Sequence, residues 1–206
     1  MGEERVDTGG ASVAASVAVR LREWAEGDLW VLERMNTPEM TTHLGGPETE
    51  EQVRARHARY LPPDADGGRM YVVVADLAPH AGAHTGADLD PGADGRVVGS
   101  IGFWGRVWQE EPVFETGWGV LPEFQGRGVA VAAARAVVER AAAVGTRRHL
   151  HAYPSIDHRA SNAVCRRAGF TLLGEVAFEY PKGRPMRCND WRIDLAEGGG
   201  PGPIPG

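Results

Sequence analysis

The residues best suited to chemistry lie in the run Gln125-Gly126-Arg127-Gly128-Val129-Ala130, between an apolar stretch and a long alanine-rich stretch. Two glycines let the backbone come close to a ligand, and the first amides of a helix have no partners within that helix. The helix dipole adds positive potential at the same point. The run therefore predicts a turn from a strand into a helix that binds an anion such as a pyrophosphate.

The neighbours of the two glycines fit this interpretation and disfavour two others. Arg127 supplies a cation at the rim, and Ala130 is small enough to leave the helix start open to a ligand. A dinucleotide site needs a third glycine where Val131 and Ala132 follow, and the Gly-Lys-Ser/Thr of a phosphate loop is absent. On spacing alone, a tight connection that binds nothing stays an open alternative.

The apolar pattern predicts the elements that position this turn. Asp28 is placed to cap the first helix. Strands are expected at residues 17–22, 70–75, 97–104, 113–120, 149–153, 170–178 and 186–195, and helices at 29–35, 48–60, 128–144 and 159–168. This order predicts an α/β (α+β) fold: a mixed, mostly antiparallel central sheet of about seven strands with flanking helices, and one parallel pair bridged by the alanine-rich helix.

With this arrangement the chain resembles the GCN5-related N-acetyltransferases (GNAT). Their coenzyme A signature is Gln or Arg, two residues, Gly, one residue, then Gly or Ala, and Gln125, Gly128 and Ala130 match it. In the family a strand enters the signature, a second strand diverges from it, and a helix closed by Gly-Phe follows, here Gly169-Phe170. The resemblance implies the GNAT fold, acetyl-CoA as co-substrate and N-acetyltransferase activity.

The resemblance spans nearly the whole chain, from about residue 17 to residue 195. Three features look most similar to the branch that acetylates the N-termini of ribosomal proteins. They are Leu21-Arg22 with Asp28, the strand Glu115-Thr116-Gly117-Trp118, and Ser161. The resemblance implies these acetyl-CoA-binding residues: Val120, Gln125, Gly126, Arg127, Gly128, Val129, Ala130, His158 and Ser161.

The chain departs from the family in the helix that follows the diverging strand. Family members often carry an asparagine and a tyrosine there, at the positions that His158 and Cys165 occupy here. His158 keeps a polar group that can hydrogen-bond coenzyme A, whereas Cys165 replaces a phenolic acid with a thiol. We keep Cys165 as a candidate proton donor and, alternatively, as a small core residue. Because of both replacements, an acyl-CoA-binding sensor or scaffold with weak turnover stays an alternative function.

The predicted reaction is a direct transfer without an acyl-enzyme, and it requires a neutral amine. A lysine amine has a pKa of about 10.4, so a base or a water relay helps the attack. Glu115 is the leading candidate base, on the strand that enters the signature, and His151 on the diverging strand is the reserve. The alternative for Glu115 is an ion pair with a neighbouring arginine. A backbone amide near Val120 is expected to stabilise the developing charge on the carbonyl oxygen.

The acceptor is expected to be an amine-bearing small molecule or a protein N-terminus, bound by loops. The candidate loops are residues 40–47, which contain His43, and residues 105–112, which contain Trp108 and Glu110. Carboxylates attract an amine and Trp108 can lie over it, although loop aromatics also cover small cores. A homodimer that completes this pocket stays an open alternative.

The composition limits the other partners. The 22 Lys and Arg against 28 Asp and Glu give a formal net charge of −6, which argues against a nucleic acid. No apolar run reaches the roughly 20 residues that cross a membrane. We expect free thiols at Cys165 and Cys188, a cytoplasmic protein, one N-acetyltransferase domain at residues 16–196, and flexible termini at 1–15 and 197–206.

One group of side chains has a spacing that a metal uses. His80 and His84 stand four residues apart near Asp88 and Asp90, which suits a metal site on a helix. Several glycines and a proline in the same segment disfavour a helix. We therefore expect no metal.

Overall fold

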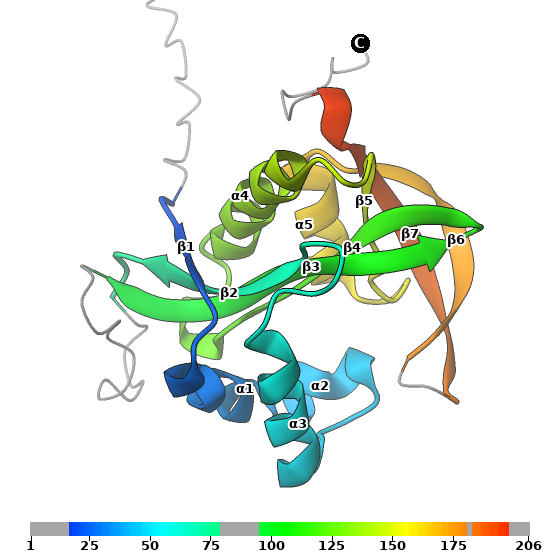
Figure 1. The fold of residues 1–206 in the computed structure, drawn as a ribbon. Coiled ribbons are helices and arrows are strands. Elements are labelled where there is room, and N and C mark those ends of the chain that lie inside the picture. The colour runs from blue at the N-terminus through cyan, green and yellow to red at the C-terminus, as the bar shows by residue number, and fades with distance from the viewer. Residues whose placement is uncertain (1–16, 79–94, 181–182, 198–206) are drawn as a thin grey trace, which may run out of the picture.

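The computed structural model describes residues 17–78, 95–180 and 183–197, which form a seven-stranded sheet flanked by helices (Figure 1). The helices are α1 (Leu29–Met35), α2 (Pro38–Thr41), α3 (Glu50–Tyr60), α4 (Val129–Val144) and α5 (Arg159–Ala168), with short 3-10 turns η1 (Glu26–Asp28), η2 (Thr42–Leu44), η3 (Pro122–Phe124) and η4 (Leu195–Glu197). The strands are β1 (Arg20–Glu23), β2 (Arg69–Ala75), β3 (Arg96–Trp108), β4 (Glu111–Val120), β5 (His149–Ala152), β6 (Thr171–Glu179) and β7 (Pro185–Asp194).

Some of the predicted features fall on residues that the structure does not describe. Both expected tails do so, except that Glu197 belongs to η4. The candidate metal ligands also lie outside the described residues; they are His80, His84, Asp88 and Asp90.

The sheet has the order β1-β2-β3-β4-β5-β7-β6, and its one parallel pair among the described strands is β4 with β5. All the other neighbours are antiparallel. This confirms the predicted fold class, including the parallel pair bridged by the alanine-rich helix α4. The parallel register joins Phe114 to Leu150 and Glu115 to His151, and β4 then continues to Val120 while β5 ends at Ala152.

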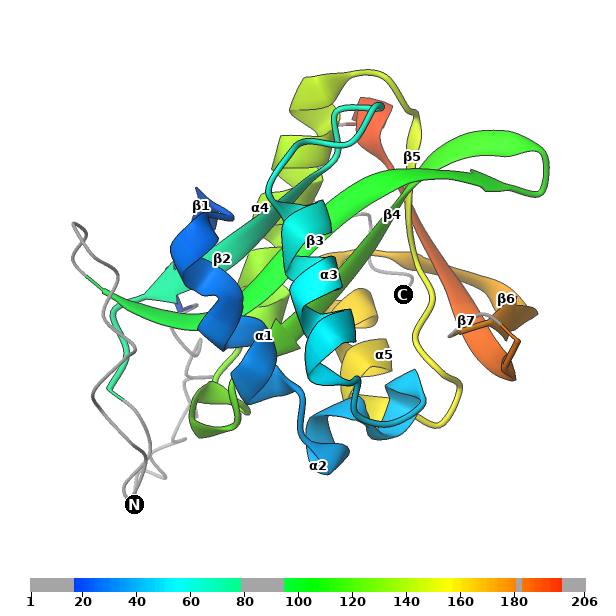
Figure 2. The same ribbon diagram turned by 60° about the horizontal axis from the view of Figure 1, so that its bottom comes forward.

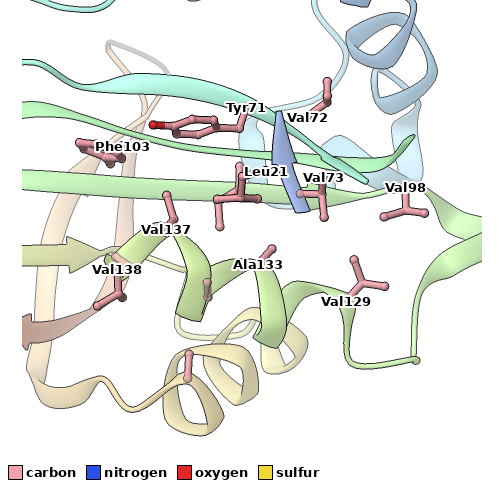
Figure 3. Packing of buried hydrophobic residues seen from close by; sticks show 14 of the residues in the cluster. Leu21, Tyr71, Val72, Val73, Val98, Phe103, Val129, Ala133, Val137 and Val138 are labelled. Atoms are coloured by element: carbon pink, nitrogen blue, oxygen red, sulfur yellow. The ribbon is translucent and has the colours of Figure 1, made fainter. Parts of the chain in front are cut away.

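The helices cover the two faces of the sheet separately. Helices α4 and α5 lie on one face, and α1, α2 and α3 lie on the other (Figures 1 and 2). On the first face, Val129, Ala133 and Val137 of α4 point at the sheet, where Leu21 and Val73 meet them (Figure 3). Complete burial of one valine side chain contributes about 1.5–3 kcal/mol, so this layer fixes α4 firmly against the strands.

The start of α1 differs from the prediction. Asp28 occupies the N-cap position, but its side chain makes no capping bond to the helix. Its carboxylate instead accepts two hydrogen bonds from Arg22 of β1, at 2.7 and 3.0 Å, and one from the amide of Ala25 at 2.7 Å. The buried carboxylate therefore closes the connection between β1 and α1, because a guanidinium offers it a stronger paired contact than the helix amides.

Candidate active site

The predicted anion turn is an open backbone loop between β4 and α4. Gly126 and Gly128 take left-handed conformations, with φ of 72° and 83°, which other residues rarely adopt. A Cβ atom at Gly126 would meet no non-adjacent heavy atom of the described residues within 4 Å, and one at Gly128 would meet only Val17 Cγ1, at 3.8 Å. The turn therefore leaves free space where a bulky anion needs it.

The helix that follows presents its first amides at this turn. The hydrogen bond from the Ala132 amide to the Gly128 carbonyl, at 3.0 Å, is the first rung of α4. The amides of Val129, Ala130 and Val131 precede this rung and have no acceptor within the helix. They lie at the positive end of a helix that runs to Val144, which favours an anion.

Two contacts hold the turn in place against the rest of the fold. The Gln125 side-chain amide donates to the Val120 carbonyl at 2.9 Å, which ties the turn back to the end of β4. The buried carboxylate of Glu123 accepts a hydrogen bond from Arg34 of α1, which ties η3 to the opposite face of the sheet. The family's glutamine thus has a visible structural role before any ligand is considered.

Arg127 also has a protein partner. Its guanidinium donates to the carbonyl of Ala78, the last residue described before the gap at 79–94. The predicted role of Arg127 as a cation at the rim stays a prediction, and the bond would have to be kept or exchanged when an anion binds.

The end of β4 directs backbone amides away from β3. The Leu121 amide donates to the Val98 carbonyl at 2.9 Å, which makes these two residues a hydrogen-bonded pair of the antiparallel ladder. Such pairs alternate with pairs whose amides point outward, so the amides of Trp118 and Val120 point toward the β5 side. Since the β4–β5 register stops earlier, they face the gap between the two parting strands.

Glu115 lies at the point where β4 and β5 part. Its side chain is 14% exposed, and Arg106 Nη1 donates to its Oε2 at 2.5 Å. Burial raises the pKa of Glu115 above its ordinary value, and the positive charge of Arg106 opposes part of that rise. The arginine pairing that the sequence left open is therefore present, and the role of general base stays a prediction.

His151 is the register partner of Glu115 and is 4% exposed. Its Nδ1 lies 2.7 Å from Asp190 Oδ1 on β7. The other Asp190 oxygen accepts from Trp108 Nε1 at 2.9 Å, so one buried carboxylate fixes both rings. A histidine bonded in this way through Nδ1 has its orientation fixed, and its role as a reserve base stays a prediction.

The N-terminus of α5 meets the first predicted acceptor segment. His158, the residue before α5, stacks on His43 of η2 with ring centroids 4.2 Å apart. Burial, and secondarily His43, lower the pKa of His158. His43 Nδ1 also lies 3.3 Å from Asp157 Oδ1. The structure thus brings together one predicted acceptor residue and one predicted coenzyme residue, with Ser161 in the first turn of the same helix.

Cys165 lies inside the core on α5. It is fully buried and belongs to the hydrophobic core cluster. Burial raises the pKa of its thiol to about 12. Both cysteines are free, as expected, and both are buried; the location of Cys165 favours the alternative in which it is a core residue.

The second predicted acceptor loop, residues 105–112, is not a loop. β3 runs to Trp108 and β4 starts at Glu111, so only Gln109 and Glu110 form the turn, with φ of 48° and 69°. The ladder with β4 continues through Arg106, Val107 and Trp108, and the two-residue turn closes a regular hairpin. Glu110 therefore lies at the exposed tip, and the Trp108 ring lies on the sheet.

Three residues of this region were missed from the sequence: Arg106, Tyr153 and Asp190. Each lies on or next to a strand and reaches the site only through the sheet register. None of them had a local signal in the sequence: Asp190 is buried and therefore needs a partner, but its burial follows from the sheet and its partners are remote in the chain.

The sequence matches the family model for the "Acetyltransferase (GNAT) domain" over residues 18–171. The chain belongs to the GNAT acetyltransferase family. This confirms the family indicated by the signature at Gln125 to Ala130. Its class is an acyl-CoA-dependent N-acetyltransferase with acetyl-CoA as co-substrate. No curated protein sequence matches the chain significantly.

Several solved structures share this GNAT fold. An acetyltransferase from Agrobacterium tumefaciens str. C58 is 23% identical, with a TM-score of 0.61, over 93% of this chain and 99% of the other. Spermidine N-acetyltransferase from Vibrio cholerae is 15% identical, with a TM-score of 0.64, over 86% and 96%. A Salmonella typhimurium acetyltransferase that modifies the N-terminal serine of ribosomal protein L7/L12 is 20% identical, with a TM-score of 0.63, over 87% and 96%. At sequence identities this low, the similarity to these structures shows a shared fold and does not show a shared substrate.

The described residues also bear on two further features, a membrane-spanning helix and a metal site. They contain no helix that is long and apolar enough to cross a membrane. They also contain no group of three His, Cys, Asp or Glu side chains placed to hold a metal ion.

Proposed function

We propose that this GNAT chain moves the acetyl group of acetyl-CoA to a primary amine by direct attack in a ternary complex. The observation that carries the proposal is the position of the open glycine turn beside the gap between β4 and β5. The Val120 amide points toward that gap, and Glu115 lies where the gap begins. The Glu115 carboxylate, the outward amide of Val120 and the glycine turn that can bind an anion therefore follow one another along β4 and the connection that leaves it.

The residues present fit acetyl-CoA. The open space at Gly126 and Gly128 leaves room for the pyrophosphate, and the first amides of α4 favour its negative charge. His158 and Ser161 at the start of α5 would contact the same ligand. When bound, acetyl-CoA supplies an activated acetyl carbonyl.

The chain's own groups then act on the reacting atoms. The Val120 amide would donate to the acetyl oxygen as charge develops there. Glu115 would accept the proton of the attacking amine, directly or through water, and the raised pKa brings it closer to neutral pH, where a base works best. A thiolate with an ordinary pKa of about 8.5 leaves without a strong acid, so the buried Cys165 is not required as a proton donor.

The acceptor in this proposal is an amine, either of a small molecule or of a protein N-terminus. The acidic net charge of −6 favours a cationic acceptor. Structures of the same fold include an enzyme for spermidine and one for a ribosomal protein N-terminus, so both classes are compatible with this scaffold. A homodimer and a cytoplasmic location stay predictions.

The test is a screen for release of the coenzyme A thiol from acetyl-CoA, with N-terminal peptides, polyamines, amino acids and aminoglycosides as acceptors. The proposal expects release above hydrolysis with at least one amine class, and mass spectrometry should find that amine heavier by one acetyl group. If coenzyme A binds but no amine of the panel is acetylated, the sensor or scaffold alternative replaces it.

A further inference from the structure

Three aromatic rings and a carboxylate surround one guanidinium beside Glu115. The Arg106 guanidinium carbon lies 4.5, 5.3 and 5.4 Å from the ring centroids of Phe178, Trp108 and Tyr153. These distances are within the roughly 6 Å at which a cation is attracted to the face of an aromatic ring. The three rings and the Glu115 carboxylate, which lies 2.5 Å from Arg106 Nη1, form a cage around the cation. We call this group the Arg106 cage.

The register explains how the cage forms. Trp108 belongs to β3, Tyr153 follows β5 and Phe178 belongs to β6. Their rings meet on one face of the sheet, across β4 and β7, which lie between these elements. The rings support one another, with centroids 4.8 Å apart for Trp108 and Tyr153, and 4.9 Å for Tyr153 and Phe178. The bond from Trp108 to Asp190 fixes the first ring, so the walls of the cage do not depend on the cation inside.

The cage lies on the sheet face that carries α1. Side chains an even number of positions apart in a strand share a face, and the β3–β4 register is uninterrupted. Ser100 on β3 contacts Met35 of α1, so Arg106 and Trp108 point to that same side. Helix α4, which would hold the coenzyme pyrophosphate, lies on the other face. The cage is therefore separate from the glycine turn and the first amides of α4, which we call the donor grip. Glu115 nevertheless places the cage where β4 and β5 diverge.

Two polar atoms of the cage lack a hydrogen-bond partner among the described residues. They are the Tyr153 hydroxyl and Arg106 Nε, and both are shielded from solvent. A buried polar group without a partner is destabilising, so the guanidinium leaves the polar groups of the cage incompletely satisfied. The Arg106 side chain is also 31% exposed, which gives it a path out to solvent.

We propose that the Arg106 cage is the binding site for a cationic group of the acceptor, an alkylammonium or a guanidinium, and that Arg106 is its built-in occupant. The acceptor displaces Arg106 on binding. The exchange replaces one cation with another, so the charge beside Glu115 stays balanced. This inference rests on the proposed function, because it deepens the choice of acceptor at the same site.

The test measures binding without turnover. Choline is the probe, since its quaternary ammonium suits an aromatic cage and carries no amine to acetylate, and 3,3-dimethylbutan-1-ol is its neutral analogue. We expect Arg106→Ala to bind choline at least tenfold more tightly than the unchanged chain in calorimetry, with no such gain for the neutral alcohol. Arg54→Ala is the matched control, because Arg54 forms an exposed pair with Glu50 on α3. It should leave choline binding unchanged.

A second variant tests the walls. Phe178→Leu keeps an apolar side chain but removes the ring nearest to the guanidinium. In the Arg106→Ala background it should abolish most of the choline gain. Unchanged choline affinity in Arg106→Ala, or an equal gain for the neutral alcohol, would overturn the proposal and leave Arg106 as a residue that only pairs with Glu115. Since no acetyl-CoA is needed, this result is independent of the thiol-release screen.

Discussion

The donor grip and the Arg106 cage are neighbours along β4, but they are made of different parts of the chain. The donor grip consists of backbone groups, two left-handed glycines and the first amides of α4, and it follows the outward amide of Val120. The cage consists of side chains from β3, β4, β6 and the residues after β5. The first region comes from one continuous segment, whereas the second exists only after the sheet has formed.

This difference predicts that binding of the acetyl donor and binding of the acceptor respond differently to substitution. Backbone amides bind any suitable anion and do not change with most substitutions, so the donor grip should depend mainly on the space that glycine leaves. Side chains determine shape and charge directly, so the acceptor side should respond to single substitutions. The following variants test that division, beginning with the largest effect.

Gly128→Glu should abolish coenzyme A binding. It adds a charged side chain in the space of the turn and strains a residue with φ of 83°. Losing two charge-assisted hydrogen bonds at about 2 kcal/mol each corresponds to an affinity loss of about a thousandfold. Calorimetry with coenzyme A measures it. Gly145→Glu is the control, because Gly145 has a similar φ of 70° and open surroundings at the other end of α4. If both variants bind equally, the donor grip is not at this turn.

Asp190→Ala should lower the free energy of unfolding by about 3 kcal/mol, because His151 and Trp108 both lose a buried acceptor. Urea denaturation followed by circular dichroism gives this value. Glu175→Ala removes a carboxylate from an exposed pair with Arg187 and should cost less than about 1 kcal/mol. Equal losses in the two variants would show that Asp190 does not organise the buried rings.

Glu115→Gln should lower kcat by about a hundredfold at neutral pH while the affinity for coenzyme A stays the same. The substitution keeps the size of the side chain and removes its ability to accept a proton. A pH–rate profile is the measurement, and the acidic limb assigned to the base should disappear. An unchanged profile would exclude Glu115 and favour His151 as the base.

His158→Gln should have the smallest effect, visible in the pH dependence of stability. The pKa of His158 is lowered in the folded chain, first by burial, so its contribution is fully present above about pH 6.5 and is lost as the pH falls through the lowered pKa. Between about pH 7.5 and 5.5 the variant's thermal midpoint should fall less than that of the unchanged chain, by about 2 °C or less. His149, whose pKa is also lowered, keeps part of the dependence in both proteins. An identical fall in both would contradict the prediction.

The contrast between a site built from one segment and a site built across the sheet also explains which features could be predicted from the sequence. The glycine turn, the parallel pair and the helix from Arg159 to Ala168 follow from local spacing and apolar period, and the structure has them at nearly the predicted bounds. Trp108 was expected in an acceptor-binding loop at residues 105–112, yet cross-strand pairing extends the hairpin through it. Asp28 was expected as a helix cap, and the nearby Arg22 competes successfully for its carboxylate. Arg106 and Asp190 carry no local signal for the contacts they make, since these depend on sheet register.

The tip of the β3–β4 hairpin has a consequence for folding. Gln109 and Glu110 both adopt left-handed backbone conformations, which cost about 1–2 kcal/mol for each residue that is not glycine. A two-residue turn of this kind fixes the pairing of the whole hairpin, and a slip of β4 by one position would turn Glu115 onto the face of α4, away from Arg106. The turn at one end of β4 thus sets the alignment that keeps the Glu115 carboxylate beside Arg106 and out of the apolar layer under α4.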